Sequence, residues 1–79
     1  MMLNIKDLQV GDRAKILGFS PCEPHYRQKL LSMGLLPGSV IELTCIAPLG
    51  DPLQIVTRGS VLSLRKAEAT VLKLEKIGP

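Results

Sequence analysis

The feature that most limits the fold of this chain is an alternation of apolar and polar residues, in short segments separated by glycine and proline. In segment 39–47, Ile41, Leu43 and Cys45 occupy every second position, and residues two apart lie on the same face of a β-strand. Four further segments alternate in a similar way, near 13–19, 53–58, 62–65 and 72–75. The pattern predicts about five short antiparallel strands in a small mainly β barrel or sandwich, with Cys45 among the core residues.

One segment departs from this alternation. Between residues 24 and 33, the apolar residues Tyr26, Leu30 and Met33 are spaced four and then three positions apart, which places them on one face of an α-helix. Pro24 suits the first helical position, because its missing N–H would have no partner within the helix there. The sequence therefore predicts one short α-helix inserted between the first two strands.

Glycine and proline mark the turns between these elements. Gly34 follows the predicted helix where a left-handed cap is needed, and Leu35 is placed to make the apolar contact that commonly accompanies such a cap. Segment 66–70 has the composition of one further helical turn. We assign roles in backbone geometry to a set of turn residues, namely Gly34, Pro37, Gly38, Gly50 and Pro52.

Length and composition limit the class of protein. The chain has 79 residues, enough for one compact core, so we expect a single domain over residues 1–79. No run approaches the roughly 18 apolar residues that a membrane-spanning helix needs, and Asp7 and Asp12 interrupt the region where a secretion signal would be apolar. We therefore expect a cytoplasmic protein whose Cys22 and Cys45 are reduced thiols.

The closest approach to a metal motif is the segment Cys22-Glu23-Pro24-His25, in which a thiol, a carboxylate and an imidazole lie within four positions. Divalent iron or zinc accepts ligands of these kinds. The cluster occurs once, without the second pair of ligands that makes zinc motifs specific. We favour a polar loop leading into the helix, and keep a metal site at Cys22 and His25 as the alternative.

Catalysis and nucleic-acid binding have less support. The single histidine, the scattered carboxylates and the absence of a glycine-rich phosphate loop in the sequence argue against an enzyme. The net charge of +3 is interspersed along the chain, whereas nucleic-acid-binding domains cluster their basic residues on one face. Only Phe19 and Tyr26 are available to stack on bases, and Tyr26 belongs to the apolar face of the predicted helix.

The remaining features are basic and apolar residues that folding alone does not explain. The basic ones are Arg27, Lys29, Arg58 and Arg65, which form either a solubilising surface or a charged rim. The apolar ones are Leu31, Leu35 and Leu36. We predict a partner-binding surface at the helix and the following turn, made of Arg27, Leu31, Leu35, Leu36, Arg58 and Arg65.

Three ordered blocks at residues 26–38, 47–52 and 62–66 read YRQKLLSMGLLPG, APLGDP and LSLRK. Together they resemble the ferrous iron transport protein A (FeoA) family of bacteria, and the similarity extends over nearly the whole chain. The resemblance implies an SH3-like β-barrel with a helical insertion. It also implies a protein without enzymatic activity, because the family has no established catalytic residues to transfer to this chain.

The resemblance further implies a cytosolic accessory protein that binds the membrane ferrous iron transporter, ferrous iron transport protein B, and regulates it or helps to assemble it. Its partner would be the transporter's cytosolic G-protein domain, which would recruit it to the inner face of the cell membrane. We expect no nucleic-acid partner, no direct membrane insertion and no resident cofactor. Two alternatives stay open: a basic barrel that binds nucleic acid, and an iron chaperone that uses Cys22 and His25.

Overall fold

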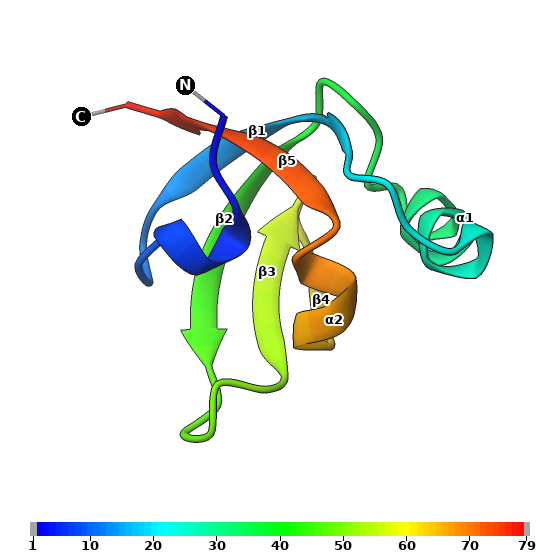
Figure 1. Ribbon diagram of the computed structural model, residues 1–79. Coiled ribbons are helices and arrows are strands. Elements are labelled where there is room, and N and C mark those ends of the chain that lie inside the picture. Colours follow the sequence, from blue (N-terminus) through cyan, green and yellow to red (C-terminus); the bar gives the residue numbers. More distant parts are fainter. Residues whose placement is uncertain (1, 79) are drawn as a thin grey trace.

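The computed structural model describes residues 2–78 and shows a mainly β architecture (Figure 1). Five strands form one antiparallel sheet in the order β4-β3-β2-β1-β5. The elements follow along the chain as η1 (Ile5–Asp7), β1 (Arg13–Phe19), α1 (Pro24–Ser32), β2 (Val40–Ile46), β3 (Leu53–Thr57), β4 (Ser60–Leu64), α2 (Lys66–Ala69) and β5 (Leu72–Ile77).

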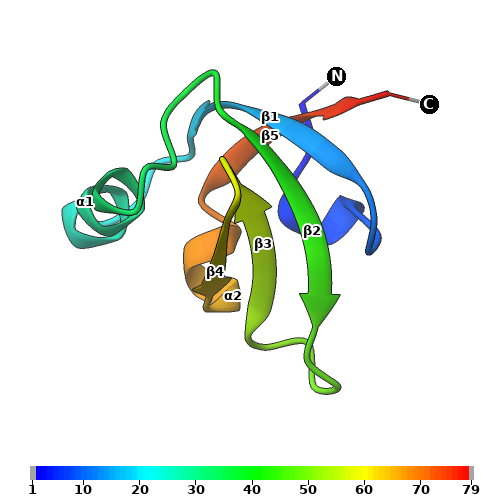
Figure 2. The same ribbon diagram turned by 180° about the vertical axis from the view of Figure 1, so that it is seen from behind.

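The predicted elements are confirmed. The inserted helix α1 lies between β1 and β2, and the short helical turn expected near the end of the chain is α2. Both views place α1 to one side of the sheet (Figures 1 and 2). No helix in the described part of the chain is long and apolar enough to cross a membrane.

The sheet is not closed into a barrel, which corrects this detail of the expected fold. β4 and β5 are the two end strands, and they pair with β3 and β1 respectively. The outer side of β5 is met by the N-terminal segment instead. The Leu3 N–H donates to the Leu74 carbonyl (2.6 Å), and the Leu3 carbonyl accepts from the Leu74 N–H (2.9 Å). In a closed barrel, the outer side of β5 would pair with another strand. Here Leu3, which precedes β1, occupies that position.

The core lies on the inner side of the curved sheet, where the alternating apolar residues meet. Every strand contributes to it, and full burial of one large aliphatic side chain stabilises a fold by about 1.5–3 kcal/mol. The large side chains that are almost fully buried are Ile16, Leu30, Leu35, Ile41, Leu43, Ile55, Leu64, Leu72 and Leu74. The predicted helix face is confirmed too, since Tyr26 and Met33 are half-buried against this core.

The end of α1 explains why Leu35 belongs to the core. Gly34 has a φ of 85°, a left-handed conformation that glycine adopts without the cost a side chain would add. Its N–H donates to the Leu31 carbonyl (3.0 Å), and the Leu35 N–H reaches back to the Leu30 carbonyl (3.0 Å). This pair of hydrogen bonds is a Schellman cap, which brings the residue after the glycine onto the last helical turn. The prediction that Leu35 is an exposed docking residue is therefore wrong.

A β-bulge in β2 places Cys45 on the surface. The pairing between β2 and β3 shifts register between Leu43 and Cys45, so that Leu43 faces Ile55 while Cys45 faces Gln54. An extra residue in one strand reverses the side on which the following side chains emerge. Cys45 is exposed, and the prediction that it lies in the core is wrong. Both cysteines are free thiols, as expected.

The turns carry the backbone conformations that their residues predict. Gly38 and Gly50 have φ angles of 93° and 84°, and the Asp51–Pro52 peptide bond is cis. β3 and β4 are joined by a two-residue turn in which Arg58 and Gly59 both have positive φ, 52° and 79°. Two consecutive positive φ angles define the type I′ turn, whose twist matches that of the strands it connects.

Candidate docking surface

A groove of about 480 Å³ runs between the end of β1 and the helix α1. α1 contributes Arg27 and Leu31, and the other lining residues are Gly18, Phe19, Ser20, Pro21, Cys22, Pro37 and Lys73. A second hollow continues along α1, where Pro24 and Gln28 join Cys22, Arg27 and Leu31. The helix insertion thus creates a continuous recessed surface beside the sheet.

Arg27 is held at the rim of this groove. Its guanidinium carbon lies 5.8 Å from the centre of the Phe19 ring, within the range of a cation–π contact. Leu31 is 36% exposed, and Leu36, in the turn after α1, is 40% exposed. The surface therefore combines fixed positive charge with exposed aliphatic side chains, a combination that suits an apolar side chain and a neighbouring carboxylate of a protein partner.

The structure separates the residues predicted to form one docking surface. Arg27 and Leu31 line the same groove, and Leu36 is exposed in the following turn. Arg58 lies in the turn between β3 and β4, and Arg65 lines a different cleft. The surface that remains around α1 is smaller than the sequence predicted, because Leu35 is buried and the two C-terminal arginines lie elsewhere.

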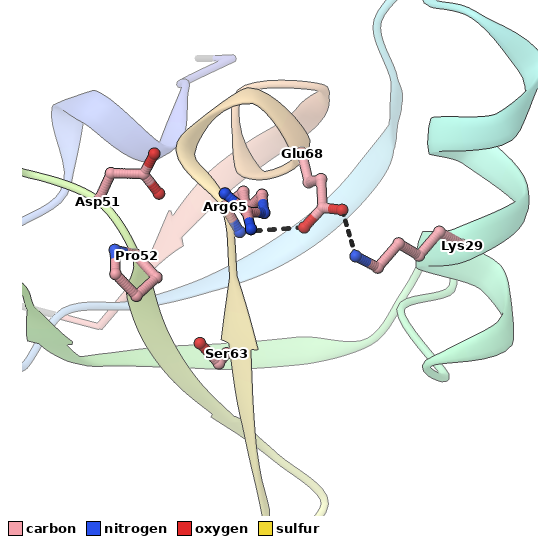
Figure 3. Close-up of a pocket in the computed structure, with 6 residues that line it drawn as sticks. All are labelled: Lys29, Asp51, Pro52, Ser63, Arg65 and Glu68. Atoms are coloured by element: carbon pink, nitrogen blue, oxygen red, sulfur yellow. Dashed lines mark hydrogen bonds and ion pairs between the residues drawn. The ribbon is translucent and has the colours of Figure 1, made fainter.

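The cleft lined by Arg65 has a volume of about 320 Å³ and lies between α1, β4 and α2 (Figure 3). Its lining residues are Lys29, Asp51, Pro52, Ser63, Arg65 and Glu68. Glu68 accepts a hydrogen bond from the Arg65 backbone N–H (3.0 Å) and forms an ion pair with Lys29. Asp51 accepts a hydrogen bond from the Lys66 N–H (3.0 Å).

Burial and hydrogen bonding act in opposite directions on the pKa of Glu68. Its side chain is only 6% exposed, and this burial opposes ionisation. The hydrogen bonds from Lys29 and the Arg65 N–H, together with the charges of both side chains, outweigh burial and hold the pKa of Glu68 below its usual range. The sequence patterns did not single out Glu68 as a site residue. One signal was present, because an acid three positions after a helix N-cap can reach back to the N-cap N–H.

The structure does not gather a metal site around Cys22 and His25. Cys22 is exposed at the groove, while His25 Nδ1 lies 3.2 Å from Glu23 Oε2 and its ring lies 4.2 Å from the Tyr26 ring centre. Among residues 2–78, no group of three or more histidine, cysteine, aspartate or glutamate side chains is positioned to hold an ion. A metal site at Cys22 and His25 stays a prediction.

The family model of the FeoA domain matches residues 3–76. The chain belongs to the FeoA family. This confirms the resemblance seen in the sequence. The family is associated with ferrous iron transport, since a similar protein from Clostridium thermocellum, 32% identical over 95% of this chain, is named iron(II) transport protein A. The family is not a known enzyme family.

Solved structures of other proteins agree with this membership. A FeoA-like protein from Clostridium acetobutylicum is 32% identical, with 99% of this chain and 90% of that one covered and a TM-score of 0.89. The protein PA4359 from Pseudomonas aeruginosa is 44% identical, with 90% of this chain and 96% of that one covered and a TM-score of 0.72.

A more distant FeoA, from Stenotrophomonas maltophilia, is 17% identical, with 92% of this chain and 89% of that one covered and a TM-score of 0.78. That protein was solved in complex with zinc and described as a prokaryotic SH3 domain protein, and a role as a bacterial ferrous iron transport activating factor has been suggested for it. At this identity the likeness concerns the fold alone, and it supports the SH3-like class for the present sheet.

Proposed function

We propose that this protein is a cytosolic accessory protein of ferrous iron uptake that docks through the α1 groove on the membrane ferrous iron transporter. Docking alters the transporter's conformation or its nucleotide cycle, or helps to assemble it. The observation that carries the proposal is the presence of exposed Leu31 beside Arg27 in this groove, with exposed Leu36 in the turn that follows α1, in a member of a family associated with ferrous iron transport.

The proposed partner is ferrous iron transport protein B, contacted at its cytosolic G-protein domain. The groove carries Arg27 and Lys73, so the matching surface presents carboxylates around an apolar side chain. Opposite charges of this kind accelerate encounter and set orientation, while the apolar contact supplies most of the affinity. The accessory protein works in the cytoplasm and reaches the inner face of the membrane through the transporter.

Both alternatives gain less support from the geometry. Base stacking needs open aromatic faces, whereas Arg27 covers Phe19 and Tyr26 is half-buried beside His25. An iron chaperone needs a set of converging ligands, whereas His25 is turned to Glu23. Docking on a protein uses the exposed leucines that neither alternative explains.

Calorimetric titration of the protein into the transporter's soluble G domain tests the proposal. Three titrations are compared, with GDP, with a non-hydrolysable GTP analogue and without nucleotide. Binding in at least one state supports docking, and a difference between the states supports coupling to the nucleotide cycle. No heat of binding in any state, with both proteins folded, contradicts docking on this domain.

A further inference from the structure

The outer edge of β4 is open. β4 is an end strand of the sheet, and its one strand partner among the described residues is β3. The opposite end strand, β5, differs because Leu3 forms two backbone hydrogen bonds with Leu74 on its outer side. The outer edge of β5 is thus hydrogen-bonded to Leu3, whereas the outer edge of β4 has no such backbone partner among the described residues.

The free backbone groups of β4 belong to Val61 and Ser63. A two-residue type I′ turn closes with a hydrogen-bonded pair of residues, which here is Thr57 and Ser60. Along an antiparallel strand, successive residues direct their N–H and C=O groups alternately toward the neighbour and away from it. The N–H and C=O groups of Val61 and Ser63 therefore point away from β3.

β4 lacks the usual protection of an exposed edge. Natural edge strands carry charges, prolines or bulges that prevent pairing with other chains. β4 has the sequence Ser-Val-Leu-Ser-Leu, with none of these features, and its pairing with β3 is in continuous register. Val61 is 65% exposed on this strand. A strand with these properties is a template for β-augmentation by an extended peptide.

Positive charge stands at both ends of the open edge. Arg58 precedes β4 and Arg65 follows it, and neither side chain forms an ion pair with another residue of the described chain. Of the carboxylates nearby, Glu68 pairs with Lys29 and interacts with Arg65 through its charge without an ion pair, and Asp51 accepts the Lys66 N–H. Ser63 and Arg65 also line the cleft of about 320 Å³ beside α1 (Figure 3), which leaves room next to the strand.

We propose that the β4 edge binds an extended acidic segment of a partner protein as an added strand. The backbone of the segment pairs with Val61 and Ser63, and an acidic side chain near each of its ends meets Arg58 and Arg65. At about 3.3 Å per residue, a segment of roughly six to eight residues spans this edge. The site differs from the α1 groove, and its test does not require the iron transporter.

The probe is a capped peptide of six residues that alternates valine and threonine between two terminal glutamates. It is titrated into ¹⁵N-labelled protein, and amide shifts and hydrogen exchange are followed by NMR. We expect saturable shifts of the Val61 and Ser63 amides and slower exchange at both. Two N-methylated peptides serve as controls, each methylated on one alternate set of amides. Only one set faces β4, so we expect one peptide to bind and the other to lose binding.

Two protein variants test the two components of the site. Ser63→Pro removes a free N–H without removing a hydrogen bond to β3, since proline is tolerated at such edge positions, and we expect about tenfold weaker binding. Ser63→Thr keeps the N–H and is expected to bind like the parent. Arg58→Asn with Arg65→Gln removes both charges, and asparagine tolerates the positive φ at the first site. This double variant is expected to bind more weakly and with less dependence on salt.

The titration has outcomes that overturn the proposal. Unchanged Val61 and Ser63 amides at millimolar peptide contradict it, as does equal binding of the two N-methylated peptides. If exchange at these amides slows with rising protein concentration and no peptide, a second copy of this chain occupies the edge and the acidic segment is ruled out. If a lysine-ended peptide binds as well as the glutamate-ended one, the proposed role of the two arginines is wrong.

Discussion

Lys29 of α1 forms an ion pair with Glu68 of α2, so that one side chain from each helix joins two segments 39 positions apart in the sequence. The Glu68 side chain is 6% exposed and the Lys29 side chain 52% exposed. Because the acid is buried and the base is not, the pair is neither a surface ion pair nor a fully buried one. It is the one ion pair between these two helices in the described chain.

We expect this pair to contribute measurably to stability. A double-mutant cycle with Lys29→Met and Glu68→Gln isolates the interaction, and unfolding in urea measures each free energy. The expected coupling is about 1–2 kcal/mol, above the roughly 0–1 kcal/mol typical of exposed pairs. A coupling energy indistinguishable from zero would show that the pair forms without stabilising the fold.

The same carboxylate predicts a pH dependence. The folded state holds the pKa of Glu68 below its usual range, so at acid pH the unfolded state binds more protons than the folded state. The stabilisation is fully present above the unfolded pKa and is lost as pH falls through the folded pKa. We expect the free energy of unfolding to fall less steeply in this acid window for Glu68→Gln than for the parent. Parallel curves for the two proteins would contradict this assignment.

Leu35 and Leu36 are neighbours in the sequence with different roles. Leu35 is fully buried and Leu36 is 40% exposed. Leu35→Ala is expected to lower the free energy of unfolding by about 2–5 kcal/mol, because it leaves a cavity under the helix end. Leu36→Ala is expected to change it by less than about 0.5 kcal/mol. Urea denaturation of both variants checks the difference, and equal losses would place the two side chains in similar environments.

Both thiols are exposed, which predicts rapid reaction with a thiol reagent in the native state. We expect two labelled cysteines per chain without denaturant, and one in each of the Cys22→Ser and Cys45→Ser variants. Labelling of Cys45 that required denaturant would show that its side chain faces the core, as the alternation of β2 suggested, and that the bulge does not form.

The sequence was sufficient to predict the five strands, α1 and α2 in their order along the chain, because burial on one side of a sheet requires alternation and most turns contain glycine or proline. It did not predict the short helix η1. The sequence did not reveal where a strand departs from regular pairing with its neighbour. The bulge after Leu43 changes the facing of Cys45, yet alternation of apolar residues continues through it. The prediction of a closed barrel was wrong for a similar reason. The contact between Leu3 and Leu74 joins residues far apart in the chain, and local patterns do not reveal it.

The docking surface stays a prediction, but the structure shows which of its residues lie together. Arg27 and Leu31 share a groove because helix geometry brings residues four apart together, and this could be read from their spacing. Leu35 follows the glycine cap of α1, and a residue at that position commonly makes an apolar contact with the last helical turn. Its burial could therefore have been predicted from the sequence. Glu68 was missed because the partner of an acid, here Lys29 on another helix, cannot be found from local spacing alone.

The central claim, docking through the α1 groove, is tested most directly by binding of variants to the transporter's G domain. Arg27→Glu with Leu31→Asp alters the groove, and Lys6→Glu with Leu49→Asp makes the same changes at exposed residues that do not line it. Circular dichroism and urea unfolding confirm that both variants are folded. We predict that the groove variant binds at least about tenfold more weakly than the parent and that the control variant binds like the parent. Parental affinity in a folded groove variant would contradict the account.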